Sequence, residues 1–227
     1  MRFAAVLRTA GELLVTAGVI LLLFVVYELK ITDLQTAQSQ RTLRSELQHQ
    51  WAAPAPVASP AGGPQLRAAD PGQGLAVLRI PRFGAAYAPV VVEGVSTHDL
   101  ELGPGHYPGT ALPGQVGNFV VSGHRTTYGH PFTDLDQLRV GDPVVVETRD
   151  SWFTYSVTST RVVPPTQTGV VLPVPDQPAA TPTQRLLTFT TCNPKYSAST
   201  RLIVLATLTD THPKADGLPT ALAGFSQ

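Results

Sequence analysis

Seven short segments rich in β-branched and aromatic residues lie between residues 73 and 210, and they constrain the fold more than any other feature of the chain. Gly, Pro and Asp residues separate them, as expected where turns connect short strands. Only two short helices are predicted in this region, at residues 97–102 and 133–138. We therefore predict a mainly β domain, a sandwich or a closed barrel of seven or eight strands. The predicted strands are residues 75–80, 89–92, 119–122, 143–148, 152–163, 185–191 and 202–209.

An uncharged apolar run precedes this domain, at residues 13–27 (LLVTAGVILLLFVVY). As a helix this run is about 22 Å long, whereas residues 9–29 reach about 31 Å, enough to cross the roughly 30 Å hydrocarbon layer of a membrane. The sequence that follows offers no small-residue site of the kind at which a signal peptide is cleaved. We therefore predict residues 1–30 as an uncleaved, single-pass membrane anchor with the rest of the chain outside the cytoplasm. A cleaved signal peptide is the alternative.

The remaining segments connect or extend the predicted domain. Residues 31–72 are predicted as a solvated juxtamembrane helix followed by a spacer rich in Pro and Ala. A second Pro-rich stretch, residues 164–182, links two predicted strands, and loops of this length are usually functional or disordered. Residues 211–227 show little periodicity and are predicted as a frayed tail. The globular domain is therefore assigned to residues 73–210.

Charge and cysteine content exclude several classes of function. The 16 Lys and Arg residues balance the 16 Asp and Glu residues, so the chain lacks the basic surplus that binding to nucleic acid requires. Its single Cys excludes an intrachain disulfide framework and any zinc or iron–sulfur site built on several cysteines. The open question is whether that one thiol is inert or reactive.

The single Cys, Cys192, ends a predicted strand (LLTFTTC). Most lone cysteines are small buried hydrophobic residues, but the rigid end of a strand is also a suitable position for a nucleophile. Arg201 lies nine residues further on, at the start of the next apolar segment. If the two segments form an antiparallel hairpin, Arg201 faces Cys192 across its open end. The guanidinium would then stabilise a thiolate, or the oxyanion that forms when a carbonyl is attacked.

A cysteine nucleophile also needs a base, and the chain has six histidines. His124 (FVVSGHRT) follows an apolar strand directly, as Cys192 does, so a shared sheet edge would bring the two together. His106, in a turn-rich segment, and His130, before a proline, remain alternatives. The others lie in the predicted stalk, surface helix and tail: His49, His98 and His212.

Together these motifs resemble the sortase family of cysteine transpeptidases, whose signature is a strand-end His, a TLxTC-type motif and a later Arg. The chain has NFVVSGHRTTYGHPFTDLDQLRVGD, LLTFTTCNP and Arg201 in that order. LRIPRFGAAYAPVVVEG and GHYPGTALPGQVGN are similar to the segments before the His. Phe189 departs from the motif, which usually has Leu there. The resemblance covers residues 75–208, and the anchor, the Pro-rich spacer and the CNP string are most similar to the class E sortases of actinobacteria.

The resemblance implies a closed β-barrel with its active site on one face. It also implies that Cys192 attacks the Thr–Gly bond of a C-terminal sorting signal of LPxTG type, or LAxTG for class E, and forms a thioacyl enzyme. His124 would act as general acid and then as general base. Arg201 would hold the substrate and the oxyanion.

Further expectations follow from the same resemblance. Substrate contacts are predicted at Thr190, Thr191 and Tyr107, with Thr191 as a second donor to the oxyanion, and in the loop at residues 164–182. The acceptor would be an amine of a cell-wall peptide, lipid II or a pilin lysine. No cofactor is implied, and no acidic cluster near the predicted groove indicates a calcium or other metal site.

Three alternatives belong to other classes. An L,D-transpeptidase carries a His shortly before its Cys, at the position of Thr190 here. A papain-like protease has its Cys before its His in the sequence, which is the reverse of the order in this chain. A membrane-tethered binding module on a sortase-like barrel would have no activity, and the joint presence of Cys192, His124 and Arg201 argues against it.

Overall fold

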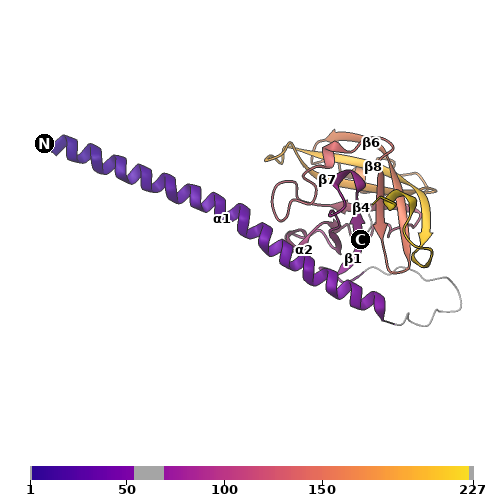
Figure 1. Cartoon of the computed structure of the whole chain (residues 1–227). Coiled ribbons are helices and arrows are strands. Elements are labelled where there is room, and N and C mark those ends of the chain that lie inside the picture. Colours follow the sequence, from indigo (N-terminus) through magenta and orange to yellow (C-terminus); the bar gives the residue numbers. More distant parts are fainter. Residues whose placement is uncertain (1, 54–68, 225–227) are drawn as a thin grey trace.

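The computed structural model describes residues 2–53 and 69–224, and its main feature is a closed β-barrel (Figure 1). Within the described residues, eight strands close in the order β1-β2-β3-β4-β7-β8-β6-β5. The prediction of a closed barrel with short helices is confirmed. The strands are β1 (Gly74–Arg79), β2 (Val90–Glu93), β3 (Gly105–His106), β4 (Gly117–Ser122), β5 (Pro143–Glu147), β6 (Ser151–Val163), β7 (Arg185–Asn193) and β8 (Thr200–Pro213).

A parallel pair of strands determines where the predicted functional residues meet. β4 and β7 run side by side from the Gly117–Arg185 pair to the Ser122–Thr190 pair, so their C-terminal ends lie at the same edge of the barrel. β2 and β3 are also parallel, and β7 forms an antiparallel hairpin with β8. The strand β3 was not predicted, because two residues are too few to show a periodic pattern.

Side chains that alternate along the strands fill the interior of the barrel. Phe119 and Val121 of β4 and Leu187 and Phe189 of β7 belong to one buried cluster, and each is at most 1% exposed. Full burial of one such side chain contributes about 1.5–3 kcal/mol to stability. Tyr155 lies in the same cluster, and its hydroxyl accepts a backbone N–H at 2.8 Å, so this buried polar group is satisfied. The core therefore fixes β4 and β7 against each other.

The two predicted short helices have different outcomes. α2 (Thr97–Leu102) forms as expected, and a capping box between Ser96 and Asp99 begins it. The predicted helix at residues 133–138 shortens to the 3-10 helix η2 (Leu135–Gln137). Buried leucines stand three residues apart in this stretch, and a 3-10 turn places residues at that spacing on one side.

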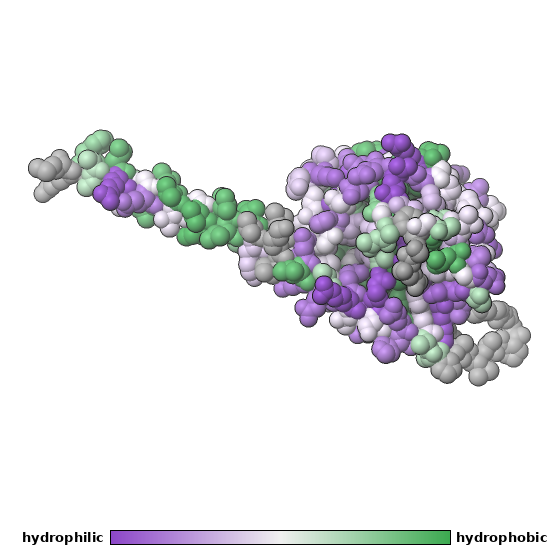
Figure 2. All heavy atoms as spheres, viewed as in Figure 1, coloured by the Kyte–Doolittle hydropathy of each residue, from purple (hydrophilic) through white to green (hydrophobic). Residues whose placement is uncertain are grey.

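α1 (Arg2–Ala52) is one continuous helix that runs from an apolar N-terminal segment to the barrel, as Figure 1 shows. Its segment Phe3–Val25 is long and apolar enough to cross a membrane, by length and composition, and no part of it is buried within the protein. In Figure 2 hydrophobic residues gather along this outer part of the helix.

The C-terminal half of α1 packs on the barrel, so the prediction of a solvated juxtamembrane helix is wrong. Leu43 and Leu47 are 7% and 3% exposed. They lie one turn apart on one face of the helix and pack in one cluster with Val77, Val90 and Val92. These valines form an apolar patch separate from the interior core, and such a patch must be covered. Two leucines are too short a stripe to reveal this packing from the sequence.

The C-terminal segment also folds onto the barrel, so the prediction of a frayed tail is wrong for the described residues up to 224. β8 continues to Pro213 by pairing with Ser151 of β6. Leu222 in η5 (Thr220–Leu222) is 4% exposed and packs with Trp152 and Val145. The tail covers a large aromatic ring that the strands alone leave open.

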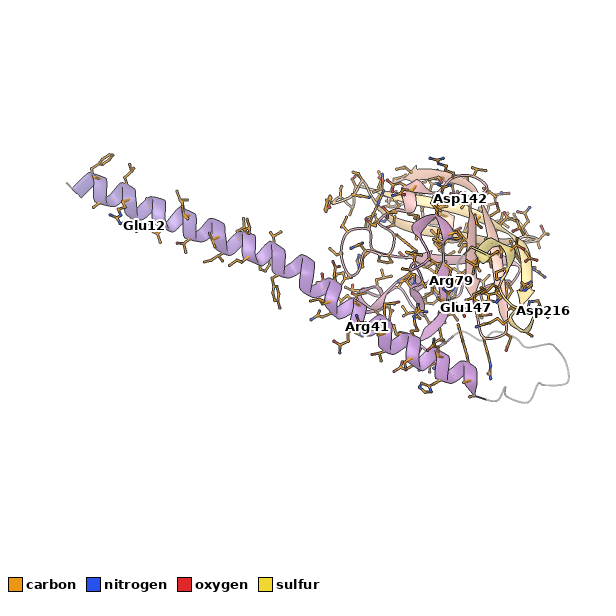
Figure 3. The ribbon with its side chains drawn as sticks, in the orientation of Figure 1. Glu12, Arg41, Arg79, Asp142, Glu147 and Asp216 are labelled. Atoms are coloured by element: carbon orange, nitrogen blue, oxygen red, sulfur yellow. The ribbon has the colours of Figure 1, made fainter. Side chains whose placement is uncertain are left out.

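A charged network joins this tail, the barrel and the end of α1. Lys214, in η4 (Lys214–Asp216), donates to Glu147 Oε1 at 2.7 Å, and Arg79 donates to Glu147 Oε2 at 2.9 Å. Figure 3 shows Arg79 and Glu147 close together on the barrel. Lys214 Nζ also lies 4.4 Å from the ring centroid of Trp51. Because the Glu147 side chain is only 10% exposed, its two cationic partners balance a largely desolvated charge.

Candidate active site

The shared edge of β4 and β7 brings two of the predicted site residues together. His124 lies two residues after the end of β4, and Cys192 is the last residue but one of β7. The ladder between the two strands ends at the Ser122–Thr190 pair, so each residue lies two positions beyond the last pair between β4 and β7. Both residues therefore follow the same end of the parallel pair, which is the arrangement that their strand-end positions predict.

Arg201 lies directly opposite Cys192 in the β7–β8 hairpin, as the spacing predicts. Its Nη1 donates to the carbonyl oxygens of Ala198 and Thr200 at 2.9 and 3.0 Å, which fixes the guanidinium against the hairpin turn. Among residues 2–53 and 69–224, no carboxylate forms an ion pair with Arg201. Within the described chain the guanidinium of Arg201 is therefore held by backbone oxygens, and it belongs to the residue paired with half-buried Cys192.

His124 is partly withdrawn from water. Burial lowers its pKa below the ordinary histidine value, and the negative charge of Glu101 only partly opposes this effect. Its Nε2 is buried and has no hydrogen-bond partner within the described part of the chain. The ring stacks obliquely on Tyr128, with centroids 5.0 Å apart and an interplanar angle of 36°. A neutral imidazole with an unpartnered nitrogen is suited to accept a proton from a thiol or an amine.

Contacts between β4 and β7 fix the backbone that carries His124. The Thr191 hydroxyl donates to the Gly123 carbonyl oxygen at 2.7 Å, and the Gly123 N–H donates to the Thr190 oxygen at 3.2 Å. A Cβ at residue 123 would lie 2.7 Å from the Phe132 ring, so only glycine fits there. The hydroxyl proton of Thr191 is therefore engaged in holding the two strands together, so of the two predicted donors to the oxyanion, hydroxyl or backbone, the backbone donor stays the prediction.

Arg125 is a site residue that sequence reasoning missed. Its side chain is 4% exposed, and Nη1 donates to Asn193 Oδ1 at 2.7 Å, with a longer contact of 3.4 Å to the Cys192 carbonyl oxygen. Its Nη2 pairs with Asp136 at 3.0 Å. Arg125 therefore links the segment after His124 to the segment after Cys192. The only sequence signal is its position beside His124, and that signal does not distinguish a buried arginine from a solvated one.

The other two candidates for the base are His106 and His130. His106 is 1% exposed in β3, its Nδ1 lies 2.7 Å from Glu93 Oε2, and its Nε2 lies 2.9 Å from the Thr110 hydroxyl. His130 lies in the loop after His124, with about half of its side chain exposed. The ring of His106 is enclosed and both of its nitrogens have partners, so the geometry favours His124 over His106 as the base.

The predicted peptide contacts lie near this edge. Thr190 is 7% exposed and pairs with Ser122, while Tyr107 is half-buried, and its backbone N–H donates to Val120 of β4 at 2.9 Å. No contact that distinguishes a substrate-binding role is seen for either side chain, so both roles stay predictions.

The Pro-rich loop at residues 164–182 is attached to the barrel. It leaves β6 after Val163, which pairs with Arg201, and it returns to β7 at Arg185, which pairs with Gly117. The loop therefore connects the edge that carries Cys192 to the opposite end of β7. Val170 is 5% exposed, and the Asn118 side chain donates to its carbonyl oxygen at 3.0 Å. Within residues 2–53 and 69–224, no group of three or more His, Cys, Asp or Glu side chains is arranged to hold a metal ion.

Comparisons with known proteins agree with this geometry. A family model described as a sortase domain matches residues 78–209. Sortase SrtE1 of Streptomyces coelicolor is 36% identical over 95% of this chain, and the chain spans 60% of that protein. The solved structure of sortase E from Streptomyces avermitilis is 45% identical, with a TM-score of 0.62 over 68% of this chain and 99% of that one.

Sortase E1 from S. coelicolor, solved with a tripeptide in its active site, is 38% identical, with a TM-score of 0.62 over 67% of this chain and 98% of that one. The matched region of the family model is more than half of the 227 residues and includes His124, Cys192 and Arg201. The chain therefore belongs to the sortase family, and class E sortases are among its relatives.

Proposed function

We propose that this protein is a membrane-anchored cysteine transpeptidase that cleaves an LAxTG- or LPxTG-like sorting signal between Thr and Gly. It then transfers the acyl group to an amine of the cell wall. The observation that carries the proposal is the placement of His124 and Cys192 at the shared end of two parallel strands, with Arg201 opposite the thiol. A thiol, a proton acceptor and a fixed cation are the groups that acyl transfer requires.

The first half of the reaction forms a thioacyl enzyme. Cys192 Sγ attacks the Thr carbonyl carbon while His124 accepts the thiol proton, and the carbonyl oxygen becomes an oxyanion. The tetrahedral intermediate collapses, the C–N bond to Gly breaks, and His124 gives its proton to the departing amine. Burial favours the neutral form of His124 by lowering its pKa, which suits this ring to accept the thiol proton.

The second half reverses these roles. The acceptor amine attacks the thioester carbonyl, His124 accepts a proton from that amine, and Cys192 leaves as the thiol after taking a proton back. Arg201 stabilises the oxyanion in both halves, since its charge has no carboxylate partner among the described residues. Removing one such donor in other enzymes costs about 10²–10³ in kcat.

The partner of this site is a short peptide of low charge. The loop at residues 164–182 runs from the Cys192 edge to the far end of β7, which suits it to cover an extended peptide. Tyr107, Thr190 and the backbone of Thr191 are candidate contacts. The acceptor amine would come from a cell-wall peptide, lipid II or a pilin lysine.

The apolar segment Phe3–Val25 supports a single-pass location in the cell membrane, with the barrel outside the cytoplasm. Mass spectrometry of the mature chain tests this assignment. An intact N-terminal segment in the membrane fraction is expected, whereas a mature chain that begins after the apolar segment would identify a released protein.

The activity test uses the full chain in lipid nanodiscs with fluorogenic LAxTG and LPxTG peptides and triglycine as the acceptor. We expect a transpeptidation product with wild type, no product with Cys192→Ala, and a severe loss with His124→Gln. His98→Gln is the matched control, because the His98 side chain is 79% exposed on α2. Peptide binding without product or thioacyl adduct would instead identify the alternative, a catalytically silent binding module.

A further inference from the structure

The loop after His124 has an unusual backbone. Tyr128, Gly129 and His130 have φ values of +52°, +69° and +35°, so three consecutive residues adopt left-handed conformations. Left-handed backbone is favourable for glycine but costs other residues free energy, and it persists only where the surroundings impose it. The question is which part of the protein holds this loop.

The membrane-anchor helix α1 contacts the middle of the loop. Asp33 Oδ1 accepts the Gly129 N–H at 2.9 Å. A Cβ at residue 129 would lie 3.0 Å from Thr36 Cγ2, so the helix also limits the volume available to the loop. Beside this contact lies an open hollow of about 370 Å³, lined in part by Arg41, Tyr128 and Gly129, which leaves space for the loop to relax once the contact is lost.

α1 is itself held firmly at this level. The Thr36 hydroxyl donates to the Glu101 carbonyl oxygen at 2.7 Å, and Thr36 is 4% exposed. The Gln40 side chain accepts the Val90 N–H at 2.7 Å and donates to the Leu102 oxygen at 2.8 Å. These bonds to β2 and α2 fix the helix on the barrel, so Asp33 is a fixed acceptor rather than a mobile surface carboxylate.

The loop transmits this contact to the catalytic histidine. Tyr128, which directly precedes Gly129, stacks on the His124 ring with centroids 5.0 Å apart. The Phe132 N–H donates to the His124 carbonyl oxygen at 3.1 Å, which closes the loop on the histidine backbone. A change at Gly129 therefore moves the ring that covers His124.

We propose that the membrane-anchor helix is part of the catalytic apparatus, with Asp33 as a positioning residue that acts on His124 through Gly129 and Tyr128. This inference rests on the proposed function of His124, because it assigns the helix a role in placing that residue. Asp33 lies eight residues beyond Val25, about 12 Å along the helix at 1.5 Å per residue. The contact therefore makes the geometry of the active site depend on a segment just above the proposed membrane span.

The test compares Asp33→Ala, Asp33→Asn and Glu46→Ala in the full chain in nanodiscs. Asp33→Ala removes the acceptor for Gly129, and we expect kcat to fall by about 5- to 100-fold, since small displacements of catalytic groups have costs of this order. KM should change by less than about twofold, since Asp33 is proposed to act on His124 and not on the bound peptide. Asp33→Asn keeps an acceptor oxygen without the charge and should restore most of the activity. Glu46 is an exposed residue of the same helix and serves as the matched control.

A second measurement needs no substrate, so it separates this inference from the proposed function. Histidine-selective NMR follows the titration of His124, on which the negative charge of Glu101 of α2 acts. His130, whose Nε2 lies 3.9 Å from Asp33 Oδ2, is followed as a separate signal. In Asp33→Ala the loosened loop exposes His124, and its titration midpoint should rise. Removal of the negative charge alone would lower the midpoint, so the two causes have opposite signs. Asp33→Asn should show at most the small charge effect.

Gly129→Ala tests the same contact from the barrel side. It adds a Cβ that meets Thr36 and disfavours the positive φ, so it should reproduce the kcat loss and the raised midpoint. The inference is wrong if Asp33→Ala keeps both the kcat and the His124 titration of wild type. It is also wrong if Asp33→Asn matches Asp33→Ala, or if Glu46→Ala loses as much activity. If neither wild type nor any variant has activity, the proposed function fails, and the titration of His124 alone decides whether Asp33 positions that residue.

Discussion

Replacement of Arg125 by Met is the substitution whose effect follows most directly from the structure. Met has a similar length and is apolar, so it fills the space without leaving a large cavity. It removes the charge-assisted hydrogen bond to Asn193 Oδ1 at 2.7 Å and the ion pair to Asp136 at 3.0 Å. The variant therefore loses the link between the segment after His124 and the segment after Cys192.

The expected magnitude follows from these contacts. A hydrogen bond to a charged group contributes about 1.5–3 kcal/mol. The ion pair adds at most about 1 kcal/mol, because the Asp136 side chain is 49% exposed and the interaction is screened by solvent. The Arg125 guanidinium is buried, and its Nε has no partner in the described part of the chain. The variant no longer has the cost of burying this charge, which offsets some of the loss. We therefore expect a net loss of about 1–3 kcal/mol, or roughly 3–10 °C in Tm for a domain of this size.

The assay combines thermal unfolding with transpeptidation kinetics on the full chain. The carbonyl of Cys192 loses a contact at 3.4 Å, and we expect kcat to fall by about 10²-fold through displacement of the nucleophile. Arg139→Met, at an exposed arginine of the same region, is the matched control and should leave both quantities unchanged. If Arg125→Met keeps the Tm within about 1 °C and kcat within about twofold of wild type, Arg125 does not position the site.

Three further substitutions test the site and the packing of α1. Burial lowers the pKa of His124, so the unfolded chain takes up a proton at a higher pH than the folded chain. Wild type should lose stability as the pH falls below about 6.5, and His124→Gln should lose less, measured by urea unfolding against His98→Gln. Arg201→Met should lower kcat by about 10²–10³-fold in steady-state transpeptidation, and an equal loss in Lys195→Met would contradict its assigned role. Leu47→Ala should cost about 2–4 kcal/mol of α1 packing, seen as faster proteolysis of the full chain, with Gln48→Ala as the unaffected comparison.

The barrel could be predicted because its signal is local. Each strand alternates or clusters apolar residues within a few positions, and turns rich in Gly and Pro separate the strands. The Cys192–Arg201 pairing could be predicted for the same reason, since a hairpin between adjacent strands follows from loop length. The parallel contact of β4 with β7 is not local, and only the shared strand-end position of His124 and Cys192 indicated it.

The packing of α1 and the buried position of Arg125, both missed by sequence reasoning, depend on surfaces created by the closed barrel. Leu43 and Leu47 look like part of a polar helix until Val77, Val90 and Val92 form an outer apolar patch for them to cover. Arg125 looks like a surface residue until Asn193 is brought opposite it. The residues in each of these contacts are far apart in the sequence, so no periodic sequence pattern indicates the contacts.

The parallel pairing of β4 and β7 makes the site depend on strands that are far apart in the sequence. An antiparallel pair would place the ends of the two strands at opposite edges, and His124 would be far from Cys192. A parallel pair needs a long connection, and here that connection consists of β5, β6 and the loop at residues 164–182. β7 lies between β4 and β8, and β8 in turn pairs with β6. The catalytic edge thus combines the end of β4 with the β7–β8 hairpin, two parts of the barrel that are far apart in the sequence.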